Sequence, residues 1–173
     1  MRDGTDFDEY VNARSPHLLR LAYLLTRDWQ TAEDLLQTTL VKVWSAWGRL
    51  DAGSPDGYVR QVMVRTHLSW RRRRWIGEVA SGDLAERAAG RPAPDQMSAV
   101  DERDRLWRRL GELPPRQRAV LVLRYFEDLS DDQIAGVLGI GVAGVRSQAS
   151  RALGRLRTDA GRSTAVHART NQR

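Results

Sequence analysis

The sequence predicts an all-α protein of two small helical domains joined by a flexible linker, with a helix-turn-helix in the C-terminal domain. Three observations carry this prediction. Apolar residues recur at the three-to-four spacing of amphipathic helices over residues 1–76 and 101–159. Residues 77–100 mix Gly, Ala, Pro and acidic residues without a sustained period, which is typical of a linker. Residues 130–157 combine a capped helix, a glycine turn and an arginine-rich helix. Residues 160–173 follow as a tail that we expect to be disordered.

The N-terminal domain is predicted to begin with two helices that share a core. Leucines crowd residues 18–25, and Thr31 with Asp34 three residues later predicts the cap of the second helix. The apolar residues of that helix predict a core stripe, made of Leu36, Leu40, Val43, Trp44 and Trp47. Glycines and a proline in residues 50–57 predict a loop.

A third helix is predicted from Tyr58 to Trp75, with Gly77 at its end. It carries a run of arginines and several aromatic residues, and it has no acidic residue. This combination is typical of proteins that bind single-stranded or opened nucleic acid, because cations hold the backbone while rings stack on unpaired bases. The alternative is a solvated basic helix end with Trp70 in the core.

The C-terminal domain is predicted to open with a charged helix over residues 101–113. Pro114 and Pro115 end this helix and preset the first turn of the next one, because proline fixes φ near the helical value. The apolar residues between 119 and 126 predict that this next helix packs beneath the helix-turn-helix.

The helix-turn-helix is the most informative segment of the chain. Ser130 with Gln133 three residues later predicts a capping box, and Gly139 suits the left-handed conformation of a tight turn. The second helix is predicted to bury Val145, Ala149, Ala152, Leu153 and Leu156. Its other face carries polar and basic residues that suit bases and phosphates, namely Arg146, Ser147, Gln148, Ser150, Arg151 and Arg155. A packed helical hairpin with a solvated arginine face is the alternative.

Composition narrows the function further. The net charge of +6 is concentrated in two basic segments, residues 58–75 and 113–173, which alternate with acidic ones. This pattern predicts contact with a polyanion at two separate places. The chain has no cysteine and three scattered histidines, so we expect no metal and no cofactor. We see no Gly-rich phosphate loop and no nucleophile beside a base, and therefore predict a protein that is not an enzyme. The absence of a signal sequence or long apolar run predicts a cytoplasmic protein without membrane insertion.

Four motifs in order resemble a known family. They are TAEDLLQTTLVKVW (31–44), GYVRQVMVRTHLSWRRRR (57–74), LPPRQRAVLVLRYFEDLSDDQIAGVLGI (113–140) and VRSQASRALGRLR (145–157). Together they resemble bacterial RNA polymerase sigma factors of the extracytoplasmic-function (ECF) type, and within them an actinobacterial SigE-like subgroup. The resemblance implies a region 2-like domain over 1–76 and a region 4-like domain over 101–159. The implied partners are core RNA polymerase, through the clamp of its largest subunit and its flap, then promoter DNA and an anti-sigma factor.

The resemblance also implies three sets of binding residues. The second helix is expected to contact the polymerase clamp through Asp34, Leu35, Gln37, Thr38, Val41, Lys42 and Trp44. The apolar Leu35 and Val41 lie outside the predicted core stripe, which favours a partner-binding face. The basic helix is expected to capture bases of the minus-ten element and hold phosphates through Arg65, Ser69, Trp70, Arg71, Arg72, Arg73 and Arg74. The minus-thirty-five element is expected to be read by Arg146, Ser147, Gln148, Ser150 and Arg151.

Two other classes of function remain open from the residues. A stand-alone helix-turn-helix regulator would dimerise through its N-terminal helices and bind palindromic sites without polymerase. An RNA-binding or nuclease-like protein would use the aromatic and arginine-rich helix. A metal or acid–base set for the nuclease is missing from the sequence.

Overall fold

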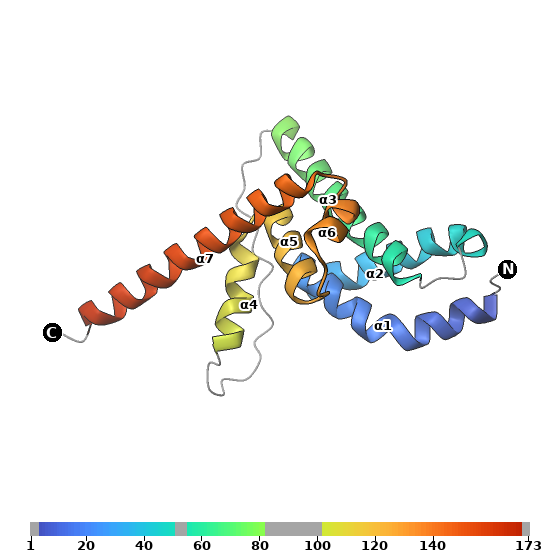
Figure 1. Cartoon of the computed structure of the whole chain (residues 1–173), viewed down its shortest axis with the longest axis horizontal. Coiled ribbons are helices and arrows are strands. Elements are labelled where there is room, and N and C mark those ends of the chain that lie inside the picture. The colour runs from blue at the N-terminus through green and yellow to red at the C-terminus, as the bar shows by residue number, and fades with distance from the viewer. Residues whose placement is uncertain (1–3, 51–54, 82–101, 171–173) are drawn as a thin grey trace. The chain divides into compact units, whose positions relative to one another are not determined.

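The computed structural model describes residues 4–50, 55–81 and 102–170 (Figure 1). These residues form helices and turns and contain no strand, which confirms the all-α prediction. The first of two compact units contains α1 (Gly4–Thr26), α2 (Trp29–Ala46), the short 3-10 helix η1 (Trp47–Arg49) and α3 (Asp56–Ser81). The second contains α4 (Glu102–Glu112), α5 (Pro115–Tyr125), the start of α6 (Asp131–Leu138) and α7 (Val142–Thr170).

The core of the first unit lies where α2 packs between α1 and α3. The buried side chains are mostly aliphatic: Leu18, Leu21, Ala22, Leu24 and Leu25 from α1, Ala32, Leu35 and Val43 from α2, and Val59, Met63 and Val64 from α3. The predicted leucine-rich first helix therefore supplies one wall of this core. Trp47, which follows α2, is 2% exposed and contacts the rings of Phe7 and Tyr10 in α1.

Helix α2 begins at Trp29, two residues before the predicted cap. Asp28 is the cap instead, and its Oδ2 accepts hydrogen bonds from the backbone N–H of Thr31 at 2.7 Å and from the Thr31 hydroxyl at 2.6 Å. Thr31 is thus the partner of the cap rather than the cap itself. The Thr31 hydroxyl, followed by its N–H, holds the pKa of the Asp28 carboxyl below its usual value, because both hydrogen bonds favour the charged form.

The buried face of α2 is rotated relative to the predicted core stripe. Val43 and Trp47 are buried as predicted, but Leu36 and Leu40 are partly exposed and Trp44 is 52% exposed. The buried residues of α2 are instead Ala32, Leu35, Thr39 and Val43. Their spacing of three and four residues is helical, so the period was predicted correctly and its phase was wrong.

Thr39 explains why the phase was missed. Its side chain is fully buried, although a polar residue there suggests a solvent-facing position. The Thr39 hydroxyl donates to the backbone carbonyl of Leu35 at 2.7 Å. This hydrogen bond satisfies the polar group inside the helix, so Thr39 occupies the core much as an aliphatic residue would.

Helix α3 is anchored to α1 at its first residue. The Asp56 Oδ1 accepts hydrogen bonds at 3.0 Å from the Tyr10 hydroxyl and from the Arg14 Nε, and Arg14 Nη2 donates to the other carboxylate oxygen. Burial first, and then Asp56, raises the pKa of Tyr10. At its other end α3 runs to Ser81, past Gly77, which was predicted to end it. One glycine costs a helix only about 1 kcal/mol and does not by itself stop it.

A buried arginine joins the first two helices of the second unit. Arg118 in α5 is 5% exposed. Its Nε donates to the carbonyl of Leu110 at 2.8 Å, and its Nη2 donates to the carbonyls of Gly111 at 2.8 Å and Leu113 at 3.0 Å. These carbonyls lie at or just past the end of α4, where intrahelical donors run out, so Arg118 caps that helix from its neighbour. The Leu110 carbonyl also accepts from the backbone N–H of Leu113 at 3.3 Å. Pro115 opens α5, as its sequence position predicts.

The predicted capping box and turn of the helix-turn-helix are confirmed. The backbone N–H of Ser130 donates to Gln133 Oε1 at 2.9 Å, and the N–H of Gln133 donates to Ser130 Oγ at 3.3 Å. Gly139 has φ +66°, a conformation that glycine adopts without a steric penalty. The two helices of the motif are therefore bounded as the sequence predicts.

Helix α7 is longer than predicted. It buries Val145, Ala149, Ala152 and Leu156, while Leu153 is partly exposed rather than buried. Its backbone stays helical through residues 160–170, which were predicted to be a disordered tail. Alanine and arginine, which favour helices, recur in this segment, and proline is absent from it. Residues 82–100 of the predicted linker, residue 101 and residues 171–173 lie outside the described residues.

Candidate functional site

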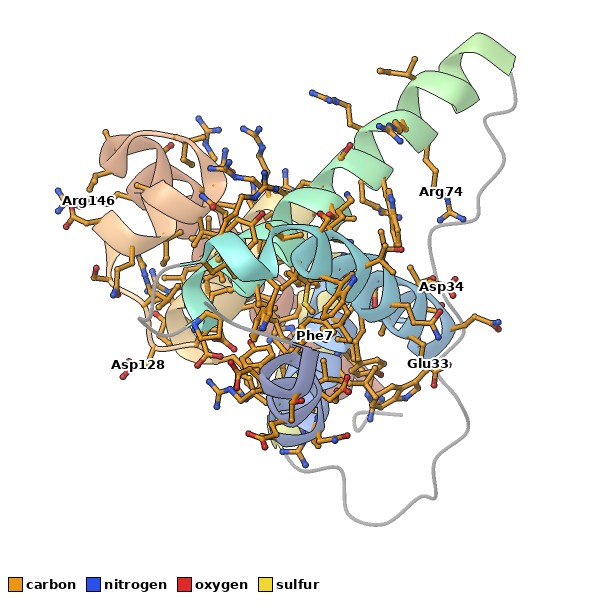
Figure 2. The ribbon with its side chains drawn as sticks, turned by 90° about the vertical axis from the view of Figure 1, so that its right-hand side faces the viewer. Phe7, Glu33, Asp34, Arg74, Asp128 and Arg146 are labelled. Carbon is orange, nitrogen blue, oxygen red and sulfur yellow. The ribbon has the colours of Figure 1, made fainter. Side chains whose placement is uncertain are left out.

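The exposed side of α2 presents a mixed polar and apolar surface, which we call the α2 face and define as Asp34, Gln37, Thr38, Val41 and Trp44. Asp34, Gln37, Val41 and Trp44 follow one another at steps of three or four, and Thr38 is adjacent to Gln37, so the set shares one side of the helix. Val41 is 71% exposed and Trp44 is 52% exposed. Figure 2 shows Glu33 and Asp34 projecting from α2 at the start of this surface. Two large apolar side chains that meet solvent on one helix face suit a partner.

Leu35 was predicted to lie on this surface and does not. Its side chain is fully buried. The prediction failed because it followed from the misplaced core stripe, which left Leu35 on the outside. Val41, the other apolar residue singled out by the same argument, is exposed as predicted.

Neighbouring helices position two further residues of the predicted polymerase-binding set. The Lys42 Nζ donates to the Thr66 hydroxyl in α3 at 2.9 Å, so its ammonium is held at the edge of α2. The Trp44 ring contacts the edge of Phe7 from α1, with ring centroids 4.9 Å apart. Phe7 thus limits the orientation of Trp44 while leaving about half of its surface open.

Helix α3 carries the predicted minus-ten residues, which we call the α3 basic segment: Arg65, Ser69, Trp70, Arg71, Arg72, Arg73 and Arg74. Arg65 and Arg72 to Arg74 are exposed, whereas Ser69, Trp70 and Arg71 are partly exposed. Arg65, Ser69 and Arg72 share one side of the helix. Figure 2 shows Arg74 projecting outward from the ribbon. Trp70 keeps part of its surface open, which leaves part of its ring available to a ligand.

Helix α7 carries the predicted minus-thirty-five residues, which we call the recognition face: Arg146, Ser147, Gln148, Ser150 and Arg151. All are exposed except Gln148, which is partly so. Arg146 has 72% of its side chain exposed, and it projects from the ribbon in Figure 2. The recognition face is therefore accessible along two turns of α7.

Sequence reasoning missed an acidic residue that contacts this face. Asp131, the first residue of α6, accepts a hydrogen bond at its Oδ2 from the Arg146 Nε at 3.2 Å. Its Oδ1 accepts from Nη2 of Arg124 in α5. Arg124 first, and then Arg146, lowers the pKa of the Asp131 carboxyl. No sequence signal reveals this link, since an aspartate at a helix start is already explained by the helix dipole.

Two depressions border α7, one of about 550 Å³ and one of about 340 Å³. Arginines dominate both: Arg109, Arg151 and Arg155 line the larger, and Arg124, Arg146 and Arg157 line the smaller. Glu112 and Asp131 are their respective acidic residues. Neither lining sets a nucleophile beside a base.

Among residues 4–50, 55–81 and 102–170, no three His, Asp or Glu side chains gather as metal ligands do. No described helix combines the length and apolar character needed to cross a membrane.

Comparison with known proteins gives the family. Residues 10–76 match the model of Sigma-70 region 2, and residues 103–156 match that of Sigma-70, region 4. The chain is 38% identical over 160 residues to the RNA polymerase sigma-E factor of Streptomyces coelicolor, covering 92% of this chain and 88% of that relative. This chain belongs to the ECF-type RNA polymerase sigma factors. The stand-alone regulator is therefore not favoured.

Other comparisons agree with this sigma factor assignment. The ECF RNA polymerase sigma factor SigE of Mycolicibacterium smegmatis is 31% identical, and the match covers 87% of this chain and 60% of that one. Among solved structures, the sigma factor RpoE in complex with the anti-sigma factor NepR from Bartonella quintana matches with a TM-score of 0.68 at 25% identity. That match covers 88% of this chain and 95% of the Bartonella chain. CnrH, solved with the cytosolic domain of CnrY, matches in fold with a TM-score of 0.58 at 23% identity, over 90% and 88% of the two chains.

Proposed function

We propose that this sigma factor binds the clamp of core RNA polymerase through its α2 face and reads promoter DNA with two separate surfaces. The α3 basic segment takes the minus-ten element, and the recognition face takes the minus-thirty-five element. The observation that carries the proposal is the exposure of all three surfaces, each on a helix anchored to its own unit. The chain acts by binding and placement, and we infer no enzymatic activity.

The α2 face supports polymerase binding by its composition. Val41 and Trp44 provide apolar surface, while Asp34, Gln37 and Thr38 provide hydrogen-bonding groups around it. Protein interfaces commonly combine a few buried apolar anchors with a polar rim. Phe7 orients Trp44 before binding, which reduces the side-chain entropy lost when a partner covers it.

The α3 basic segment supports the capture of opened DNA. Arginines hold phosphates, and the partly exposed Trp70 offers a ring on which an extruded base can stack. Taking a base out of the duplex costs unstacking energy, so its capture contributes to melting as well as to specificity. Asp56 keeps the start of α3 fixed on α1 through Tyr10 and Arg14, so the segment lies on a rigid element.

The recognition face supports readout of duplex DNA. A helix with exposed arginine, serine and glutamine side chains fits the major groove, where these groups pair with base edges. Once both units share the polymerase as a platform, the binding of one raises the effective concentration of the other. An anti-sigma factor is a further partner that we infer, since the Bartonella relative is solved with one. We place the protein in the cytoplasm, where its polymerase partner acts.

Binding to core RNA polymerase without DNA tests the role of the α2 face. A Val41→Asp variant is expected to weaken binding at least about tenfold, because it places a carboxylate at an apolar anchor. Ile76→Asp is the matched control, since Ile76 in α3 is also an exposed aliphatic residue, at 59%. Fluorescence anisotropy with labelled chain measures both variants. Equal binding by Val41→Asp and the wild type would overturn the proposed docking surface.

A further inference from the structure

We propose that Asp131 is a positioning residue that holds Arg146 by its Nε and presents the two Nη groups of Arg146 to a guanine in the upstream promoter element. The inference rests on the proposed role of the recognition face and names how one of its residues achieves selectivity. Asp131 itself belongs to α6 and contacts Arg146 of α7, the helix proposed to read DNA.

The geometry gives Asp131 two roles at once. One carboxylate oxygen accepts from Arg124 in α5, and the other accepts from Arg146 in α7 at 3.2 Å. The carboxylate therefore links three helices of the second unit. Arg124 is the less exposed of the two arginines, with 24% of its side chain open against 72% for Arg146. Arg124 therefore fixes the position of the Asp131 carboxylate, and the more exposed Arg146 side chain extends toward solvent.

The contact leaves the base-reading edge of Arg146 available. A guanidinium has one edge formed by Nε and Nη and another formed by its two Nη groups. Asp131 engages the Nε, and within the described part of the chain no residue accepts a hydrogen bond from either Nη of Arg146. Two parallel N–H groups match O6 and N7 of guanine, which is the commonest specific arginine contact in the major groove.

Restricting the Arg146 side chain favours selectivity between bases over affinity for DNA. A long exposed arginine loses rotamer entropy when a base orders it, and a side chain already held loses less. The carboxylate also opposes binding, because it lies beside a surface meant for a polyanion. Arg124 stabilises the negative charge of Asp131 at this surface, and the pKa of the Asp131 carboxyl is lowered accordingly. Its neighbour Asp132 shares the helix start and is exposed, but no interaction of its side chain is found in the described residues.

The test uses full-length chain reconstituted with core RNA polymerase and a duplex library whose upstream segment is randomised. Selection gives a preferred sequence, and the position whose preference disappears in Arg146→Ala identifies the base that this residue reads. Four duplexes that differ only there then give a discrimination ratio, defined as the affinity for the preferred base over the mean affinity for the other three. Asp131→Asn is the test variant, and Asp132→Asn removes the same charge one residue away.

We expect the wild type to prefer guanine at that position and Arg146→Ala to lower the ratio about tenfold. Asp131→Asn is expected to lower the ratio about fivefold, whereas Asp132→Asn leaves it unchanged. In the Arg146→Ala background, Asp131→Asn is expected to have no further effect on the ratio. A purely structural role of Asp131 would instead weaken all four duplexes equally and leave the ratio intact, and thermal unfolding of each variant reports that loss directly.

The outcomes separate this inference from the proposed function. If Arg146→Ala keeps the wild-type preference at every position of the randomised segment, the recognition face is misassigned and the role of Asp131 falls with it. If Arg146→Ala loses the ratio while Asp131→Asn keeps it, only the positioning role is overturned. Tighter binding of all duplexes by Asp131→Asn at an unchanged ratio would show that Asp131 restrains binding rather than directing it.

Discussion

Arg118 shows how one side chain can hold two helices together through backbone carbonyl groups. It reaches from α5 to three carbonyl groups at the end of α4, where the supply of intrahelical donors ends. Hydrogen bonds from a charged donor are stronger than neutral ones, and a buried carbonyl left without a donor carries a desolvation penalty. The position of α4 in the second unit therefore depends strongly on this residue.

Replacing Arg118 with Met tests that dependence. The side chain keeps most of its apolar length but loses every donor, so we expect the free energy of unfolding of the second unit to fall by about 3 kcal/mol. Arg116→Met, an exposed position on the same helix, is expected to change stability by less than about 0.5 kcal/mol. Urea denaturation followed by circular dichroism measures both. A small loss for Arg118→Met would mean that the α4 carbonyls find other donors.

Asp28 makes the stability of the first unit dependent on pH. Its folded-state pKa is lowered, so the unfolded chain binds a proton more readily than the folded one. Stability from this residue is thus fully present above the unfolded pKa of about 4 and is lost as pH falls through the lower folded value. Asparagine also caps helices but does not titrate. We therefore expect Asp28→Asn to lose less stability than the wild type between about pH 5 and pH 2.

Thermal unfolding at stepped pH values measures this difference. Asp34→Asn is the matched control on the same helix, because the Asp34 carboxylate is exposed and no interaction is found for it in the described residues. The control is expected to follow the wild-type acid profile. An Asp28→Asn profile with the wild-type slope would contradict the role given to the cap.

At the scale of the helices, the capping box of α6 is a short signal with a large local effect. Ser130 and Gln133 satisfy each other's backbone N–H groups at the start of the helix. Ser130→Ala removes one of these bonds and is expected to cost about 1 kcal/mol of stability. Ser150→Ala, at an exposed position inside α7, is expected to be neutral or slightly stabilising, since alanine favours helices. Chemical denaturation distinguishes the two, and equal effects would show that the box contributes nothing.

Local signals in the sequence predict the boundaries that depend on a few adjacent residues. The capping box, the turn at Gly139 and the opening of α5 at Pro115 were all predicted correctly, because each depends on neighbours within three or four positions. The phase of α2 was not, since it depends on Thr39 hiding its hydroxyl against its own helix. The spacing of apolar residues shows that a helix has a buried face. It does not show which side of the helix that face occupies when a polar residue can also be buried.

The residues of the candidate surfaces also divide into those predictable from local sequence and those set by tertiary packing. The exposure of Val41 and of the arginines on α3 and α7 was predictable from charge and spacing. The burial of Leu35 and the contact between Asp131 and Arg146 were not, because they depend on packing and on residues 15 positions apart. Such contacts are set by the tertiary fold and leave no local pattern in the sequence.

At the scale of the whole molecule, the α3 basic segment and the recognition face, the two surfaces proposed to read DNA, lie on separate units of one chain. Each surface alone is small, so each is expected to bind DNA weakly. We propose that they act together on core polymerase, and linked modules gain about 10²- to 10⁴-fold over separate ones. We therefore expect the isolated chain to bind the selected promoter duplex at least about 100-fold more weakly than the reconstituted holoenzyme does.

Titration of one labelled duplex with chain alone and with holoenzyme tests this expectation. A duplex changed in both promoter elements serves as the control for nonspecific binding. Similar specific affinities with and without polymerase would instead favour a regulator that acts independently.

The inward orientation of Arg118 has a further consequence for the ionic-strength dependence of promoter binding. A protein that neutralises phosphates releases condensed counterions, and the logarithm of its affinity falls with the logarithm of salt concentration by about 0.9 per phosphate contact. Arg118 adds to the net charge of the chain but stays buried against carbonyl groups, so it releases no counterion when DNA binds. The salt slope therefore counts exposed arginines only, and it is shallower than the arginine content of the second unit suggests.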